Sequence, residues 1–150
     1  MSNKIPLIAI SAILIGGIAV TFMKTDGPTG KTMSMNGHST PQGKVFTVQD
    51  VKLPALNLTE KRGEAAFNKN CAACHGERAI GTEQGPPFLN RVYVPGHHGN
   101  QAFFQAIKTG TTQHHWPYGD MPPQPQVSQG DAASIIAYVR AVQAANGFAR

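Results

Sequence analysis

Hydrophobic positions are distributed differently in three parts of the chain, and the first part is almost continuously apolar. Residues 5–23 are nineteen uncharged and mainly apolar positions, followed by Lys24. A helix of this length spans about 28 Å, close to the hydrocarbon thickness of a bilayer. We therefore expect residues 1–24 to form a membrane anchor. A signal peptide is the alternative, although no A-x-A cleavage pattern follows Val20.

The second part, residues 25–44, is polar and has no apolar period. It is rich in Gly, Thr, Ser, Asn and Pro, which predicts a flexible linker that spans roughly 25 Å root-mean-square. Met33, Met35 and His38 lie inside it, and thioether and imidazole groups suit Cu(I). We favour incidental residues in a solvated linker over a copper site.

The third part, residues 45–150, carries the helical spacings of one folded domain. An extended lead-in over residues 45–57 is followed by a helix that we expect Thr59 to cap, with Ala66 and Phe67 on its apolar face. Gly63 lies on the same face. Glycine inside a helix costs about 1 kcal/mol relative to alanine, so it indicates close approach of another helix.

A shorter helix is predicted over residues 100–109. Asn100 is the expected cap and Gly110 the expected stop, and three apolar side chains face inward: Phe103, Phe104 and Ile107. These aromatic rings are suited either to ordinary core packing or to the wall of a cofactor pocket.

The strongest helical pattern covers residues 128–146. Ser128 and Asp131 form a capping signal, Gly147 follows the last turn, and five positions form an apolar stripe: Ala132, Ile135, Ile136, Val139 and Val142. Tyr138 lies near the edge of this stripe. We expect it to pack against Gly63 and Phe67 of the earlier helix.

Residues 71–76 read Cys-Ala-Ala-Cys-His-Gly and contain C-x-x-C-H, the motif of c-type haem attachment. Two cysteines three positions apart lie on one side of a helical turn, so Cys71 and Cys74 can both form thioethers with the vinyl groups of one porphyrin. His75 then supplies the proximal iron ligand. Its other ring nitrogen needs an acceptor, and the carbonyl of Pro86 or Pro87 is the expected one.

Two other uses of a cysteine pair fit the sequence less well. A thioredoxin-like redox pair belongs beside a βαβ pattern, which is absent from the flanking residues. A structural zinc site needs four close ligands, and the chain has no second cysteine pair. The sequence therefore predicts one covalent haem c as the cofactor.

A second informative stretch runs from Gln113 to Pro123. Met121 lies there in a loop bounded by prolines, which favours a sixth-ligand role over gap-filling in a core. Trp116 and Tyr118 are apolar rings with polar groups that can reach a haem propionate; the alternative is a buried aromatic bonded to backbone.

Charge and cysteine content narrow the function further. Thirteen Lys and Arg against eight Asp and Glu give a net charge of +5, without a dense basic run or interleaved aromatics, so nucleic acid is a poor candidate ligand.

Two cysteines are too few for a disulfide framework. A domain this short has a marginal core, which a large apolar macrocycle would reinforce.

Residues 59–147 resemble a class I monohaem cytochrome c, of the small bacterial kind that is membrane-anchored or periplasmic. The matching pieces are the helix leading into the C-x-x-C-H motif, the Gly85-Pro86 turn, the loop around Met121 and the final helix. The resemblance implies an all-α fold of about three to four helices around one covalent haem, preceded by a transmembrane or signal helix. It also implies iron ligation by His75 and Met121, a proline carbonyl near Pro86 that bonds His75, and crossed first and last helices.

Two histidine pairs, His97-His98 and His114-His115, are not required by the family pattern. One of these imidazoles in place of Met121 would give bis-histidine ligation and a lower reduction potential. We favour surface or propionate-bonding histidines.

The expected function is single-electron transfer in a respiratory or related redox chain, without substrate conversion. The expected partners are a redox protein donor and acceptor, for example a membrane oxidase or reductase, and the chain is expected to be a monomer. We expect it on the periplasmic side of the bacterial inner membrane, held by residues 5–23, or soluble in the periplasm if that segment is cleaved. The alternative is a peroxidase-like haem enzyme or gas sensor with a labile sixth ligand, in which His114 or His115 serves as distal acid or base.

Overall fold

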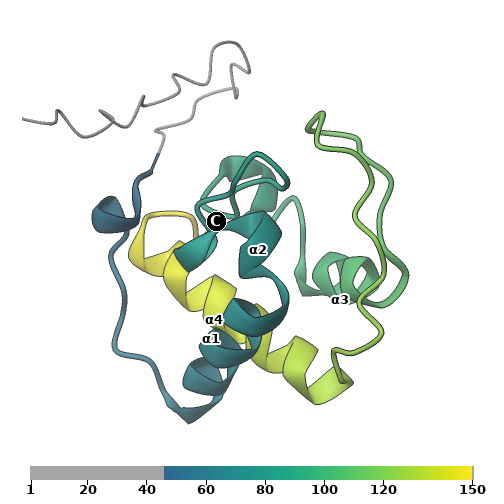
Figure 1. The fold of residues 1–150 in the computed structure, drawn as a ribbon. Helices are drawn as coiled ribbons and strands as arrows, with labels where there is room; N and C mark the ends of the chain where they lie inside the picture. Colours follow the sequence, from purple (N-terminus) through teal and green to yellow (C-terminus); the bar gives the residue numbers. More distant parts are fainter. Residues whose placement is uncertain (1–45, 150) are drawn as a thin grey trace, which may run out of the picture. The chain divides into compact units, whose positions relative to one another are not determined.

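The computed structural model describes residues 46–149, which fold as α-helices joined by loops, some of which contain short 3-10 turns (Figure 1). The helices are α1 (Leu58–Asn70), α2 (Ala72–His75), α3 (Asn100–Thr109) and α4 (Gln129–Ala145), and the 3-10 turns are η1 (Val48–Asp50), η2 (Glu77–Ala79) and η3 (Arg91–Tyr93). Extended pairing within residues 46–149 is limited to an isolated bridge between Thr111 and Met121. The all-α prediction is confirmed.

The predicted anchor over residues 1–24 and the predicted linker over 25–44 lie outside the described residues, as do Met33, Met35 and His38. From residue 46 to 149, none of the helices has the length and apolar character needed to cross a membrane.

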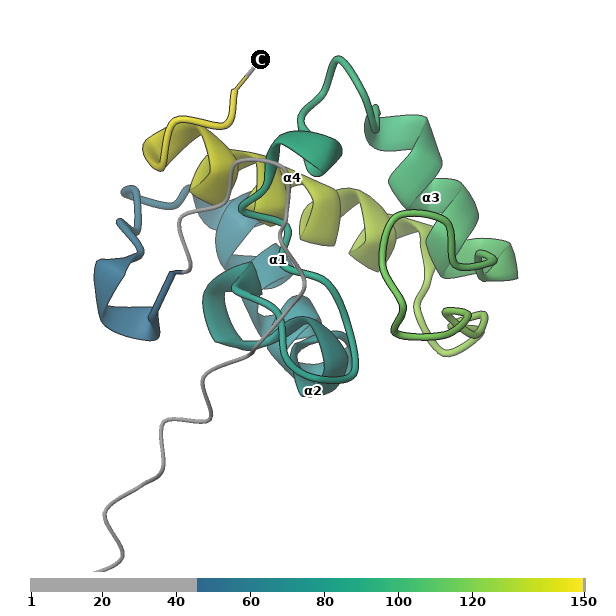
Figure 2. The same cartoon turned by 90° about the horizontal axis from the view of Figure 1, so that it is seen from above.

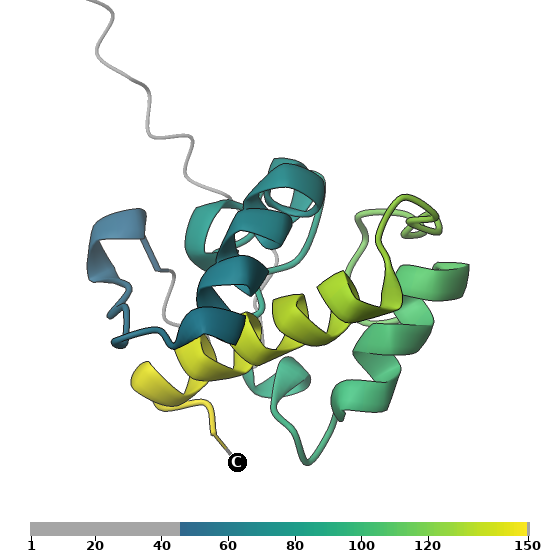
Figure 3. The ribbon, with the colours of Figure 1, turned by 90° about the horizontal axis from the view of Figure 1, so that it is seen from below.

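The first and last helices cross at a glycine, as the sequence predicts. Figures 2 and 3 show α1 lying across α4, with α3 beside the other end of α4. Gly63 is buried in the crossing, and a Cβ there would collide with the Ser134 carbonyl oxygen and come within 2.9 Å of Tyr138 Cβ. The Phe67 and Tyr138 rings pack with their centroids 5.5 Å apart. The absence of a side chain at position 63 therefore sets how closely the two helices approach.

The helix caps agree with the sequence at some ends and correct it at others. Ser128 accepts a hydrogen bond from the Asp131 amide at 3.1 Å, as predicted. The prediction that Thr59 caps α1 is wrong: the cap is Asn57, whose side chain accepts from the Glu60 amide while the Glu60 carboxylate accepts from the Asn57 amide. This capping box satisfies two exposed donors together, which a cap at Thr59 cannot do.

The cap of α3 is also corrected. Gly99 is the N-cap and Asn100 is the first helical residue. The Asn100 side chain is used elsewhere, because its Oδ1 accepts a hydrogen bond from Arg140 Nε at 2.9 Å. Gly110 ends α3 at φ 75°, as expected. Phe103 and Ile107 are buried, and Phe104 is half-buried.

Alanine at position 63 should destabilise the fold. Overpacking a close crossing costs typically 1–3 kcal/mol, and here the clash is with backbone, so we expect Gly63→Ala to lower the free energy of unfolding by about 3 kcal/mol. The measurement is chemical denaturation of the haem-loaded protein followed by far-UV circular dichroism.

Gly130→Ala is the matched control, because Gly130 is exposed in the first turn of α4 and a Cβ there meets only Ser128 Oγ at 3.9 Å. It should be neutral or stabilise by about 0.5–1 kcal/mol. Equal effects of the two substitutions would contradict the proposed role of the helix crossing.

Candidate functional site

The C-x-x-C-H motif holds one histidine in a fixed orientation. His75 ends α2 and is only 7% exposed. Its Nδ1 lies 3.0 Å from the Pro86 carbonyl oxygen, and because a carbonyl only accepts, Nδ1 carries the proton and donates. The remaining nitrogen, Nε2, therefore keeps its lone pair in the neutral ring. The imidazole also stacks on Phe88, with centroids 4.3 Å apart, and burial lowers the pKa of His75.

The loop that supplies the Pro86 carbonyl is held close to the motif by glycines. A Cβ at Gly85 would come within 2.8 Å of the Cys74 carbonyl oxygen, so the loop can approach only without a side chain at that position. Thr82 Oγ1 donates to the same carbonyl at 2.5 Å, and the Gly81 amide donates to the His75 carbonyl at 2.7 Å. The Gly85-Pro86 turn thereby carries the acceptor for His75, as predicted.

The two cysteines of the motif lie in different environments. Cys71 is half-buried at the end of α1 and lines the same cavity as His75, whereas Cys74 is exposed. Burial, together with repulsion by Cys74, raises the pKa of Cys71 to about 11. A group attached to both thiols would thus have one buried and one exposed thioether.

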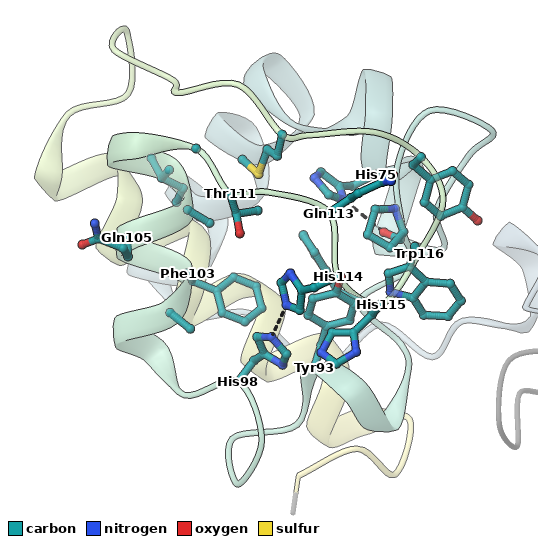
Figure 4. A pocket seen from close by; sticks show the side chains of 18 of the residues that line it. His75, Tyr93, His98, Phe103, Gln105, Thr111, Gln113, His114, His115 and Trp116 are labelled. Carbon is teal, nitrogen blue, oxygen red and sulfur yellow. Dashed lines mark hydrogen bonds between the residues drawn. The ribbon is translucent and has the colours of Figure 1, made fainter.

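A cavity of about 320 Å³ lies between the motif and the loop that follows α3. Its size is within the range of cofactor pockets, which is about 300–1,000 Å³. Cys71, His75 and the Pro86 loop form one side, and α3 with residues 110–121 contributes another. Figure 4 shows the side chains around this space. Apolar residues supply much of the lining, among them Phe88, Phe103, Ile107 and Ile135.

Met121 reaches this cavity from the far loop. Its backbone pairs with Thr111 in both directions, at 2.9 and 3.0 Å. Gly110 packs directly against the Met121 carbonyl with φ 75°, so the chain turns sharply from α3 into the segment that faces Met121. The side chain is half-buried. Two backbone bonds and a tight glycine turn therefore fix the position of residue 121.

Trp116 lines the cavity and has an unpaired polar atom. Its Nε1 is buried and makes no hydrogen bond within residues 46–149. A polar group near the indole is Tyr93, whose pKa burial raises to about 12. The indole N–H of Trp116 acts on this pKa in the opposite direction, but its geometry toward Tyr93 is not that of a hydrogen bond. An unpaired buried donor costs about 1–3 kcal/mol, so an acceptor from a bound molecule would remove a penalty. A haem, which has acidic side groups and an apolar ring, fits this combination of donor and lining.

The four histidines that depart from the family pattern gather in one place, and we call His97, His98, His114 and His115 the histidine cluster. Figure 4 labels His98, His114 and His115 among the side chains around the cavity, and the His98 ring lies 5.3 Å from the Tyr93 ring between centroids. His97 Nε2 lies 3.4 Å from His115 Nε2, and His98 Nε2 lies 3.4 Å from His114 Nε2. Burial lowers the pKa of His98, and its histidine neighbours and Arg140 lower it further.

Two residues that the sequence analysis did not single out hold the segment that carries Tyr93 and His98. Arg140 of α4 donates to the Tyr93 carbonyl at 2.6 Å and to the His98 carbonyl at 2.5 Å. Gln143 is fully buried and donates to the Phe88 and Tyr93 carbonyls at 2.8 and 3.0 Å. The sequence contains one indication of this role. Arg140 and Gln143 lie beside the apolar stripe of the last helix, and a guanidinium or amide that is buried there needs hydrogen-bond partners.

Most of the predicted site residues therefore meet in one cavity. Cys71, His75, Pro86, Trp116 and Met121 all line it, although they are spread over residues 71–121 of the chain. Cys74 is outside the lining but adjoins it through α2.

Comparison with known proteins agrees with this geometry. A family model described as Cytochrome c matches residues 60–143, more than half of the 150-residue chain. A search of curated proteins finds no match for the chain. The matched region begins in α1 and ends in α4, so it includes the motif, the cavity and the helix crossing. The chain belongs to the cytochrome c family, whose members bind haem c and generally carry electrons.

Proposed function

We propose that this cytochrome transfers single electrons through one haem attached at Cys71 and Cys74, with His75 and Met121 as axial ligands. The observation that supports the proposal most strongly is the His75 imidazole, whose Nδ1 is bonded to the Pro86 carbonyl and whose Nε2 lone pair is therefore available to iron. Met121 lines the same cavity from a separate segment. The haem, when bound, supplies the one-electron chemistry.

The surroundings favour an electron carrier over an enzyme. Two protein ligands leave no open iron position for a substrate, and a methionine axial ligand raises the reduction potential. Buried aromatic side chains, including Phe88 and Phe103, give part of the cavity an apolar wall. Met121 is held by two backbone hydrogen bonds, so little rearrangement should accompany a change of oxidation state.

We also propose that the chain exchanges electrons with a donor and an acceptor protein in a respiratory or related redox chain. The exposed Cys74 side of the motif supports this proposal, because an attached cofactor would lie near the surface there. The net charge of +5 would favour acidic faces on these partners. A periplasmic location with residues 5–23 in the membrane would suit covalent haem attachment.

Carbon monoxide tests the ligation. We expect the ferrous wild-type protein, produced in a host with c-type maturation, to bind no carbon monoxide because both axial positions are filled. Met121→Ala should open one position and bind about one equivalent per haem. Met35→Ala is the matched control and should behave as wild type.

Two outcomes would contradict the proposal. Ready binding of carbon monoxide by wild type would mean an open iron and would favour a haem enzyme or gas sensor. A Met121→Ala protein whose low-spin spectrum and exclusion of carbon monoxide are the same as in the wild type would place another side chain, such as His114 or His115, on the iron of both proteins.

Trp116 should influence the reduction potential. If its Nε1–H bonds an acidic group of the haem, it partly neutralises a negative charge that stabilises the ferric state. Trp116→Phe keeps an aromatic ring but removes the donor, so we expect a lower reduction potential by voltammetry, with an unchanged low-spin spectrum. An unchanged potential would show that the indole N–H has no cofactor partner.

A further inference from the structure

The histidine cluster contains four imidazole rings that the proposed iron ligation does not use. His75 is already one axial candidate, and Met121 is another. Four further imidazoles come from two segments, residues 97–98 after η3 and residues 114–115 in the loop after α3. One ring nitrogen from each of His97, His98 and His115 lies within 4.8 Å of the others. Neighbouring centroids in the cluster are 4.4–5.7 Å apart.

The hydrogen bonds of two members fix where their protons are. His98 Nδ1 lies 2.6 Å from the Val92 carbonyl oxygen, and His114 Nδ1 lies 2.8 Å from the Thr112 carbonyl oxygen. Since a carbonyl only accepts, each Nδ1 is the donor. In the neutral rings, both Nε2 atoms then carry lone pairs, and these two atoms face each other at 3.4 Å (Figure 4).

Two lone pairs at this separation repel unless a cation lies between them. A second pair, His97 Nε2 and His115 Nε2, lies at the same 3.4 Å separation. One ring nitrogen from each of His97, His98 and His115 lies within 4.8 Å of the others, so a single ion can contact rings from both pairs.

We propose that His97, His98 and His115 of the histidine cluster bind a divalent transition metal ion of the class that prefers imidazole, such as Zn²⁺, at a site separate from the haem iron. Zinc–nitrogen bonds of about 2.0–2.1 Å in a tetrahedron place two nitrogens about 3.4 Å apart, which is the separation of His97 Nε2 and His115 Nε2. His98 also has the Nδ1-to-carbonyl bond that usually orients a ligating histidine.

The site is anchored on one side and adjustable on the other. Arg140 of α4 donates to the His98 carbonyl, so the backbone of this histidine is fixed to the last helix. His97 and His115 are exposed and can rotate toward a common ion. Three of the four line the haem cavity, so a bound dication would lie beside the cofactor. Its charge would favour the reduced haem and raise the reduction potential.

Calorimetric titration with Zn²⁺ tests the proposal, using the full chain with its haem and without a polyhistidine tag. We expect one Zn²⁺ per chain in the wild type. His98→Gln and His115→Gln should each weaken binding by at least about 100-fold, because losing only the partners of metal ligands typically costs 10–100-fold. His38→Gln is the matched control and should bind as wild type does. Far-UV circular dichroism and the visible spectrum check that each variant is folded and loaded.

Several results would overturn the assignment. One is binding of Zn²⁺ to the wild type that is weaker than about 1 mM. Another is wild-type affinity for Zn²⁺ in the His98→Gln and His115→Gln variants, and a third is a loss of binding in His38→Gln. A changed axial-ligation spectrum in His98→Gln or His115→Gln would make that histidine an iron ligand instead.

Two measurements on wild type do not depend on a variant folding. Electron paramagnetic resonance with Cu²⁺ in place of Zn²⁺ should show splitting from at least three imidazole nitrogens, and splitting from none or one would overturn the site. Saturation with Zn²⁺ should raise the haem reduction potential, and an unchanged potential would exclude an ion beside the cofactor. The zinc results are independent of Met121, so failure of this proposal and failure of the proposed iron ligation are distinguishable.

Discussion

The hydrogen bond from His75 Nδ1 to the Pro86 carbonyl is the interaction on which the site depends. It fixes the tautomer and the orientation of a buried imidazole, and so leaves Nε2 as the free ligand atom. Several features of the sequence serve this contact. Gly85 allows the loop to approach the motif, Thr82 bonds the Cys74 carbonyl, and Phe88 stacks on the ring. The motif supplies the histidine, while the loop decides how it points.

The helix crossing holds this arrangement in place. Gly63 lets α1 lie against α4, and α1 delivers Cys71 at its end. On the other side of the same last helix, Arg140 and Gln143 bond backbone carbonyls of the segment between the Pro86 loop and α3. The last helix therefore contacts both the helix that carries the motif and the segment that supplies Phe88, Tyr93 and His98 to the cavity lining.

The sequence predicts the features that depend on neighbouring residues, and it is less informative about contacts between distant ones. The Ser128 cap, the Gly110 stop and the C-x-x-C-H motif are local and appear as expected. Asn57 displaced Thr59 as the cap of α1 because several polar residues near a helix start can serve, and only Asn57 forms the reciprocal pair with Glu60.

Long-range contacts explain the remaining differences. Arg140 and Gln143 donate to backbone carbonyls about 40 to 55 residues earlier in the chain. Because every residue has a backbone carbonyl, the sequence does not show which one accepts. The convergence of residues 97–98 with 114–115 likewise depends on how α3 and its loops are placed. The contact between Gly63 and Tyr138 is an exception. Glycine inside a helix lowers the stability of the helix, so its presence predicts that another helix packs closely at that position.

The ferric absorption spectrum of the haem-loaded protein tests the central claim most directly, since it reports the ligands on both faces at once. His75 and Met121 ligation predicts a low-spin spectrum with the weak far-red band of a methionine sulfur on ferric iron, and this band should disappear on reduction. A low-spin spectrum without the band would mean that a histidine has replaced Met121. A high-spin spectrum would mean an open iron and would contradict the assignment of an electron carrier.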